Sequence, residues 1–190
     1  MFTTLLIEQC APTLAGIKTG NMFSVRNGRY DLRGEIRRLN AVLVRKGLRL
    51  LPIRMQDDLT LVYLFRPDRL ETDLQAPEAV EILKEKGYVC GDSELCLAQL
   101  VWHLHTDETF PHEIGLFLGY PPSDVKCFME DPCSGVKCIG CWKAFGNENE
   151  AMDIFERYRK CTAIYRRERR QGKPLEALIV DTRRAVPAAG

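Results

Sequence analysis

The sequence lacks any long hydrophobic run. No stretch approaches the ~18 to 20 apolar residues that a helix needs to cross a bilayer, so we predict no membrane-spanning segment. Residues 1–16, MFTTLLIEQCAPTLAG, have no basic stretch of the kind that opens a secretion signal, and Glu8 interrupts their apolar part. We therefore expect a cytoplasmic protein.

The sequence also lacks an excess of charge of one sign. It has 27 Lys and Arg against 26 Asp and Glu, for a net charge of +1. This balance gives no overall field that would attract nucleic acid or an anionic membrane, and it disfavours both as partners. Basic residues do crowd one segment, which we interpret as the solvated face of a helix near its C-terminus, with a weak site for RNA or an acidic partner as the alternative: Arg157, Arg159, Lys160, Arg166, Arg167, Arg169, Arg170 and Lys173.

Internal repeats, low-complexity tracts and a convincing interdomain linker are absent as well. A chain of 190 residues is long enough for one domain with a substantial core. We predict a single domain over residues 1–184, followed by a flexible C-terminal tail at 185–190.

Hydrophobic spacing predicts a helix-rich α+β fold with a small antiparallel sheet. Helices are expected at 11–23, 32–46, 77–86 and 93–105, and a long one is expected to end near residue 170. Asn147 and Glu150 have the spacing of a capping box at the start of that long helix.

Strand-forming residues gather in two neighbouring runs, 48–54 and 59–66, around the polar turn 56–58. This pattern predicts a β-hairpin, and Pro52 predicts that its first strand lies at a sheet edge. A short strand at 142–145 is expected to join this hairpin in the sheet.

The segment FPHEIGLFLGYPPSDVKCFME, residues 110–130, has the spacing of a helix-turn-helix, and we predict such a pair at about 112–130. Its anchor and turn positions are Ile114, Gly115, Leu118, Gly119 and Val125. The second helix does not offer the chemistry that reads DNA bases, because its polar residues are Ser123, Asp124, Lys126, Glu130 and Asp131. The pattern therefore favours a helix pair used for packing or for contact with a partner, with DNA recognition as the alternative.

Four motifs together resemble a family of small bacterial proteins of unknown function. They are CAPTLAGIKTGNMF at 10–23, FPHEIGLFLGYPPSDV at 110–125, GCWKAFG at 140–146 and FERYRKCTAIY at 155–165. The third motif usually has Val-Tyr where this chain has Ala144 and Phe145. Members are often encoded near flavodoxin and iron-uptake genes, so the resemblance implies a role in iron or redox metabolism and a partner from that metabolism. It assigns no catalytic residues.

Four of the eight cysteines lie within fifteen residues, namely Cys127, Cys133, Cys138 and Cys141. In a reducing compartment, such cysteines are better read as metal ligands or thiols than as disulfides. The last two form Cys-Ile-Gly-Cys, which suits zinc or an iron–sulfur cluster if a second pair is supplied. The alternative is that one or two of them are core thiols and the others an exposed, reducible pair.

Cys10 and His112 form a second candidate site. Cys10 is placed at the expected start of a helix, where the helix dipole would lower the pKa of its thiol. The segment around it is similar to the nucleophile segment of bacteriocin-processing papain-like peptidases, with His112 as the base and Asp131 as the orienting residue. The alternative is that Cys10 packs in the core and His112 helps to cap its helix.

The sequence thus leaves three functions open. The first is an accessory protein of iron or redox metabolism with a cysteine-centred site, and the second is a papain-like thiol hydrolase or transferase. The third is a non-catalytic protein-binding or nucleic-acid-binding module that uses the helix pair 112–130.

Overall fold

The computed structural model describes residues 2–28 and 31–182, and the predicted helix-rich α+β class is confirmed there. The chain divides into two compact units. The first consists of the described residues up to Asp68 and from Lys160 onward, and the second consists of Arg69–Arg159. The single-domain boundary at 184 stays a prediction, and the tail predicted at 185–190 lies outside the described residues.

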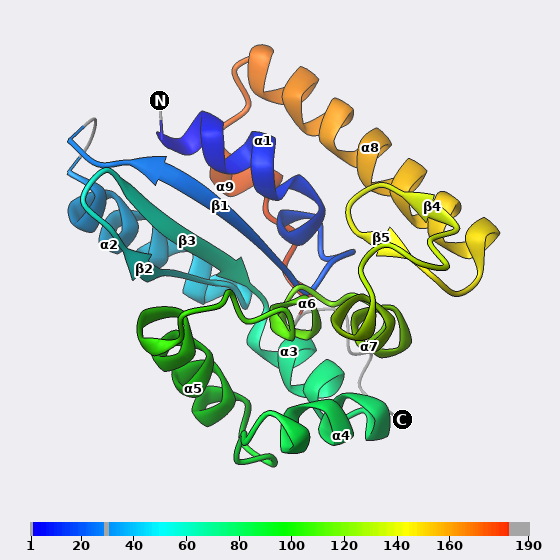
Figure 1. Ribbon diagram of the computed structural model, residues 1–190. Helices are drawn as coiled ribbons and strands as arrows, with labels where there is room; N and C mark the ends of the chain where they lie inside the picture. The colour runs from blue at the N-terminus through cyan, green and yellow to red at the C-terminus, as the bar shows by residue number, and fades with distance from the viewer. Residues whose placement is uncertain (1, 29–30, 183–190) are drawn as a thin grey trace, which may run out of the picture. The chain divides into compact units, whose positions relative to one another are not determined.

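A three-stranded antiparallel sheet forms the centre of the first unit (Figure 1). Its strands are β1 (Gly20–Arg26), β2 (Arg49–Met55) and β3 (Leu59–Phe65), in the order β1-β3-β2. The predicted hairpin is therefore confirmed as β2 and β3. Pro52 lies on an edge strand as expected, and the register shifts between Pro52 and Arg54, where the ladder tolerates a missing N–H.

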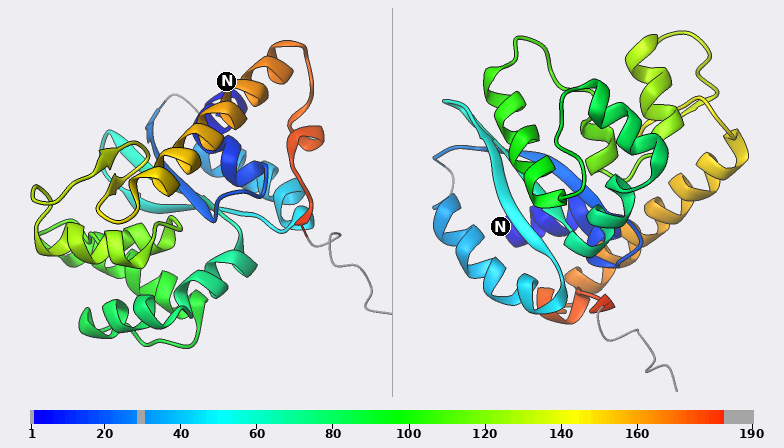
Figure 2. Two further views of the ribbon diagram at one scale, coloured as in Figure 1. Left: turned by 90° about the vertical axis from the view of Figure 1, so that its right-hand side faces the viewer. Right: turned by 90° about the horizontal axis from the view of Figure 1, so that it is seen from below.

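Three helices cover one face of this sheet. They are α1 (Phe2–Leu14), α2 (Leu32–Leu43) and α9 (Leu175–Leu178). α2 lies alongside β2 in the views of both figures (Figures 1 and 2). Period-2 alternation along β3 points Val62 and Leu64 to this face. The resulting core combines both ends of the described chain: Phe2, Leu6, Ile7, Cys10, Leu14, Phe23, Val25, Ile36, Leu39, Leu43, Leu48, Leu50, Val62, Leu64, Leu175, Leu178 and Ile179.

The helix predicted at 11–23 is wrong, because α1 ends at Leu14 and β1 begins at Gly20. Gly16 adopts φ +77° just after the helix, a conformation that a residue with a side chain rarely takes. A Cβ on Gly20 would lie 2.5 Å from the Tyr63 ring, so a glycine is required there for β1 to reach β3. These two glycines convert the expected helix into a turn and a strand.

A buried arginine ties the carboxyl end of α1 to the C-terminal segment of the first unit. Arg66 is 1% exposed and donates four hydrogen bonds of 2.8 to 2.9 Å, to the carbonyl oxygens of Thr13, Leu14 and Val180 and to Oγ1 of Thr182. A positive charge beside the last carbonyls of a helix is favoured by the helix dipole. Arg66 therefore joins three segments that are distant in the sequence.

The second unit is mainly helical. Its elements in chain order are α3 (Pro67–Leu74), α4 (Pro77–Glu85), α5 (Ser93–Thr106), α6 (Ile114–Phe117), α7 (Pro122–Glu130), β4 (Cys138–Ile139), β5 (Lys143–Ala144) and α8 (Glu148–Arg170). The first two residues of α3 and the C-terminal part of α8 belong to the first unit. The helices expected at 77–86 and 93–105 are confirmed as α4 and α5.

The expectation that the strand at 142–145 joins the hairpin is wrong. β5 pairs instead with β4 in a separate two-stranded sheet, in which Cys138 faces Ala144 and Ile139 faces Lys143. A five-residue span from Ile139 to Lys143 closes a tight hairpin locally, so the pairing needs no distant strand.

The predicted helix pair is confirmed as α6 and α7, although α6 is a single turn of four residues. Gly119 turns the chain between them with φ +73°. A Cβ on Gly115 would lie 2.8 Å from Cγ2 of Val125, so the small residue at the helix crossing is required. The pair is thus a close packing unit whose first helix is shorter than two turns.

The long helix α8 begins as predicted. Oδ1 of Asn147 accepts hydrogen bonds from the N–H groups of Asn149 and Glu150, and Nδ2 of Asn147 donates to Oε1 of Glu150. These contacts satisfy donors that the first helical turn leaves unpaired.

Candidate functional site

Cys10 lies in the interior of the first unit. Its side chain is 0% exposed, and burial raises the pKa of its thiol far above the ordinary value. The prediction that Cys10 begins a helix is wrong, because α1 begins at Phe2 and Cys10 lies in its second half. The helix dipole at that position disfavours a thiolate.

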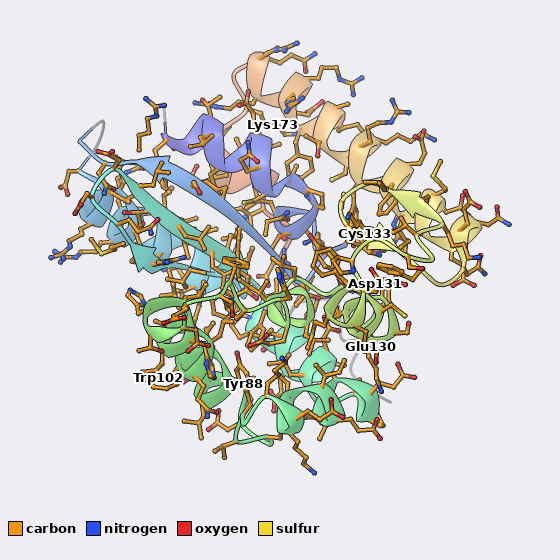
Figure 3. All side chains as sticks on the ribbon, viewed as in Figure 1. Tyr88, Trp102, Glu130, Asp131, Cys133 and Lys173 are labelled. Carbon is orange, nitrogen blue, oxygen red and sulfur yellow. The ribbon has the colours of Figure 1, made fainter. Side chains whose placement is uncertain are left out.

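The other two residues of the predicted thiol site belong to the second unit. His112 is exposed and precedes α6, and Asp131 is exposed at the end of α7 (Figure 3). Oδ1 of Asp131 accepts hydrogen bonds from the N–H groups of Cys133 and Ser134, and these bonds lower the pKa of its carboxyl group. The carboxylate therefore organises its own turn, and the thiol enzyme stays a prediction.

In the native protein, Cys10 is expected to react with iodoacetamide at least about tenfold more slowly than the exposed Cys133 near neutral pH. The raised pKa keeps Cys10 protonated, so its reaction should accelerate as the pH rises. Peptide mass spectrometry of timed samples measures both rates, and urea-unfolded protein is the control in which both thiols react alike. A fast, His112-dependent reaction of Cys10 would instead support the thiol enzyme.

The four clustered cysteines lie on different elements of the second unit. Cys127 is half-buried on α7, Cys133 is exposed after it, Cys138 is on β4, and Cys141 is exposed in the hairpin turn. Within residues 2–28 and 31–182, no group of three or more His, Cys, Asp or Glu side chains is arranged to hold a metal ion. The zinc or iron–sulfur site stays a prediction.

Electrostatics at Cys138 do not favour a metal-binding thiolate. Desolvation raises the pKa of its thiol, and the carboxylates of Glu148 and Asp124 add to the increase. Without a bound metal ion, such surroundings disfavour the thiolate form that a metal ion would bind.

A concavity of the second unit lies between the α6–α7 pair and the β4–β5 hairpin. It has a volume of about 320 Å³. We call it the aromatic pocket, and its lining residues are His112, Ile114, Gly115, Tyr120, Asp124, Val125, Phe128, Ile139, Gly140, Trp142 and Lys143.

One side of the aromatic pocket is a stack of rings. The rings of Tyr120 and Trp142 are stacked with centroids 5.1 Å apart, and Phe155 of α8 meets Trp142 edge-on at 4.5 Å. A Cβ on Gly140 would lie 2.3 Å from the Phe155 ring, so glycine in the hairpin turn allows this packing. The hydroxyl group of Tyr120 donates a 2.9 Å hydrogen bond to the carbonyl oxygen of Cys141. The hairpin is thereby held against the α6–α7 connection and against α8.

Asp124 fixes the frame of the pocket. This α7 carboxylate is 5% exposed, and its Oδ2 accepts a 2.7 Å hydrogen bond from Nε1 of Trp142. Oδ1 accepts hydrogen bonds of 2.9 Å from the N–H groups of Phe145 and Gly146. A carboxylate with three donors is satisfied when buried, so Asp124 serves as a rigid link between α7 and the segment after β5.

A second group of lining residues consists of His112, Phe128 and Lys143. The imidazole of His112 lies edge-on to the Phe128 ring at a centroid distance of 5.1 Å. Nζ of Lys143 lies 5.6 Å from the centroid of the same ring and donates a 2.8 Å hydrogen bond to the carbonyl oxygen of Pro132. This group of residues therefore combines an apolar surface with polar and cationic groups.

Part of this site was predictable from the sequence. The helix pair and His112 were predicted there, and Asp124 was a polar residue of the predicted second helix. The link between Asp124 and Trp142 was not predictable, because a carboxylate that bonds to groups 18 to 22 residues further along has no local pattern.

The basic segment of α8 is partly neutralised on the same helix. Arg159 pairs with Glu156 at 2.6 Å, and Lys173, just beyond the helix, pairs with Glu168 at 2.9 Å. Such short-range pairs are typical of a solvated helix surface.

Among the described residues, no helix combines the length and the apolar character that crossing a bilayer requires.

Fold and site together define an α+β protein with a small aromatic pocket in its helical unit. The chain belongs to the family described as "Protein of unknown function (DUF3793)", whose match covers residues 6–179. No curated protein and no solved structure matches it. Membership in a family of unknown function is thus confirmed, while the gene neighbourhood and the iron or redox role stay predictions.

Proposed function

We propose that the chain is a non-catalytic binding module whose site is the aromatic pocket. The observation that carries this proposal is a pocket with aromatic walls in a frame that Asp124 holds through three hydrogen bonds. Small-molecule sites are concave, mostly apolar and largely preformed, with volumes from roughly 300 Å³ upward. A volume of about 320 Å³ suits one planar, apolar group.

The chemistry of the lining favours binding over catalysis. Cysteine, serine and threonine are absent from the described residues that line the pocket, and the hydroxyl of Tyr120 is engaged with the carbonyl oxygen of Cys141. Asp124 is engaged with three donors, which leaves it poorly placed to act as a general base.

Trp142 provides a direct test of binding. The sequence has two tryptophans, and Trp102 lies on α5, 60% exposed and apart from α7 (Figure 3). In Trp102→Phe protein, the indole N–H of Trp142 gives a single NMR signal. We expect this signal to shift saturably when planar naphthyl compounds are added, because the ring of Trp142 lines the pocket.

A rim variant locates the binding in the pocket. Ile139 lines the pocket and is 71% exposed, so Ile139→Asp should fold normally and weaken binding of 2-naphthamide at least about fivefold. Val89→Asp is the matched control, because Val89 is also exposed but is not among the lining residues. Absence of a saturable shift with any naphthyl compound at several millimolar would refute the proposed function.

A further inference from the structure

The two charged side chains that line the aromatic pocket differ in how open they are to a ligand. The described lining contains one carboxylate, Asp124, and one ammonium group, Lys143. Asp124 is buried and already accepts three hydrogen bonds, so its oxygens are not open to a further donor from a ligand. Among the described lining residues, the charged group open to direct contact with a ligand is therefore the ammonium of Lys143.

Lys143 retains donor capacity. An ammonium group has three N–H donors, and one of them bonds to the carbonyl oxygen of Pro132 at 2.8 Å. That bond and the Phe128 ring, 5.6 Å from Nζ, hold the half-buried side chain in one place. A fixed, partly desolvated ammonium forms a stronger hydrogen bond with an anion than with a neutral group.

His112 belongs to the same group of lining residues as Lys143. Its ring is placed by the edge-on contact with Phe128, at 5.1 Å, and by Phe110, whose ring centroid is 6.2 Å away. Within the described chain, its ring nitrogens have no hydrogen-bond partner, so either nitrogen is available to a bound ligand. His112 and Lys143 thus flank the same aromatic ring with polar atoms.

We propose that the aromatic pocket binds a planar apolar carboxylate. The ring of this ligand packs against Trp142 and Phe128, and its carboxylate accepts a hydrogen bond from Nζ of Lys143, with His112 as a second polar contact. A single lysine matches a monoanion, and the ammonium repels an amine of the same shape. This inference rests on the proposed function and adds the charge of the ligand to it.

Three naphthyl compounds of one shape test the inference: 2-naphthoate, 2-naphthamide and 2-naphthylmethylamine, which are an anion, a neutral molecule and a cation. Each is titrated into Trp102→Phe protein while the indole signal of Trp142 is followed. We expect the carboxylate to bind about tenfold more tightly than the amide, and the amine to bind most weakly.

Removing the charge of Lys143 should remove the preference. In Lys143→Gln, the ratio of carboxylate to amide affinity should fall to about twofold or less, while amide binding persists and shows that the pocket is intact. Lys126→Gln is the matched control, because Lys126 is exposed on α7 outside the lining and should leave the ratio unchanged.

The possible outcomes separate the two proposals. Equal affinities for the carboxylate and the amide, or a preference that survives Lys143→Gln, would overturn the inference and leave the binding module standing. Failure of all three compounds to bind would overturn the binding module itself.

Discussion

Replacing Arg66 with methionine is expected to lower the free energy of unfolding by about 3 to 5 kcal/mol. Methionine fills much of the volume but donates no hydrogen bond. The carbonyl oxygens of Thr13, Leu14 and Val180 would then lose buried donors that now lie 2.8 to 2.9 Å away. Urea denaturation followed by circular dichroism measures the change.

Arg66→Lys is the control that separates charge from geometry. Lysine keeps the positive charge near the end of α1, but its ammonium cannot reproduce the planar fork that reaches both α1 and Thr182. We expect its loss of stability to fall between that of Arg66→Met and zero. A loss below about 1 kcal/mol for Arg66→Met would show that water replaces the guanidinium group without difficulty.

Asp124→Ala is expected to lower the free energy of unfolding by about 2 to 4 kcal/mol and to abolish ligand binding in the aromatic pocket. The substitution removes the acceptor of the Trp142 indole N–H and of the N–H groups of Phe145 and Gly146. Without that acceptor, the hairpin and the segment after it lose three hydrogen bonds to α7. Thermal denaturation measures the first effect, and the indole signal of Trp142 in a Trp102→Phe background reports the second.

Asp131→Ala is the matched control at the C-terminal end of the same helix. Asp131 is exposed and bonds to the N–H groups of its own turn, so its removal should cost less than about 1 kcal/mol and leave the pocket intact. Asp124→Asn should be intermediate, because the amide keeps an acceptor oxygen but loses the charge. Equal effects of Asp124→Ala and Asp131→Ala would contradict the role of Asp124 as the link.

Local signals predicted the elements that local interactions stabilise. Asn147 and Glu150 marked the start of α8 because a capping box is built from neighbouring residues. The hairpin of β2 and β3 was likewise visible from its polar turn. β1 was missed because Gly20–Arg26 becomes a strand by pairing with β3, some 40 residues away, which no short window records.

Local sequence patterns likewise predict only part of the aromatic pocket. The helix pair could be predicted, since Gly115 and Val125 occupy recognisable positions in the α6–α7 spacing. The roles of Asp124, Trp142 and Lys143 could not, because they depend on the hairpin returning to α7. The cysteine spacing drew attention to Cys138 and Cys141, and in the structure Cys138 lies on β4 and Cys141 lies in the hairpin turn, next to residues that line the pocket.

The Arg66 contacts have a consequence for the order of folding during synthesis. The second unit is continuous in sequence, so it can close once Arg159 has emerged from the ribosome. The first unit cannot, because its core includes Leu178 and its buried arginine bonds to Thr182. The nascent sheet and α1 must therefore wait, with an incomplete core, until nearly the whole described chain has been made.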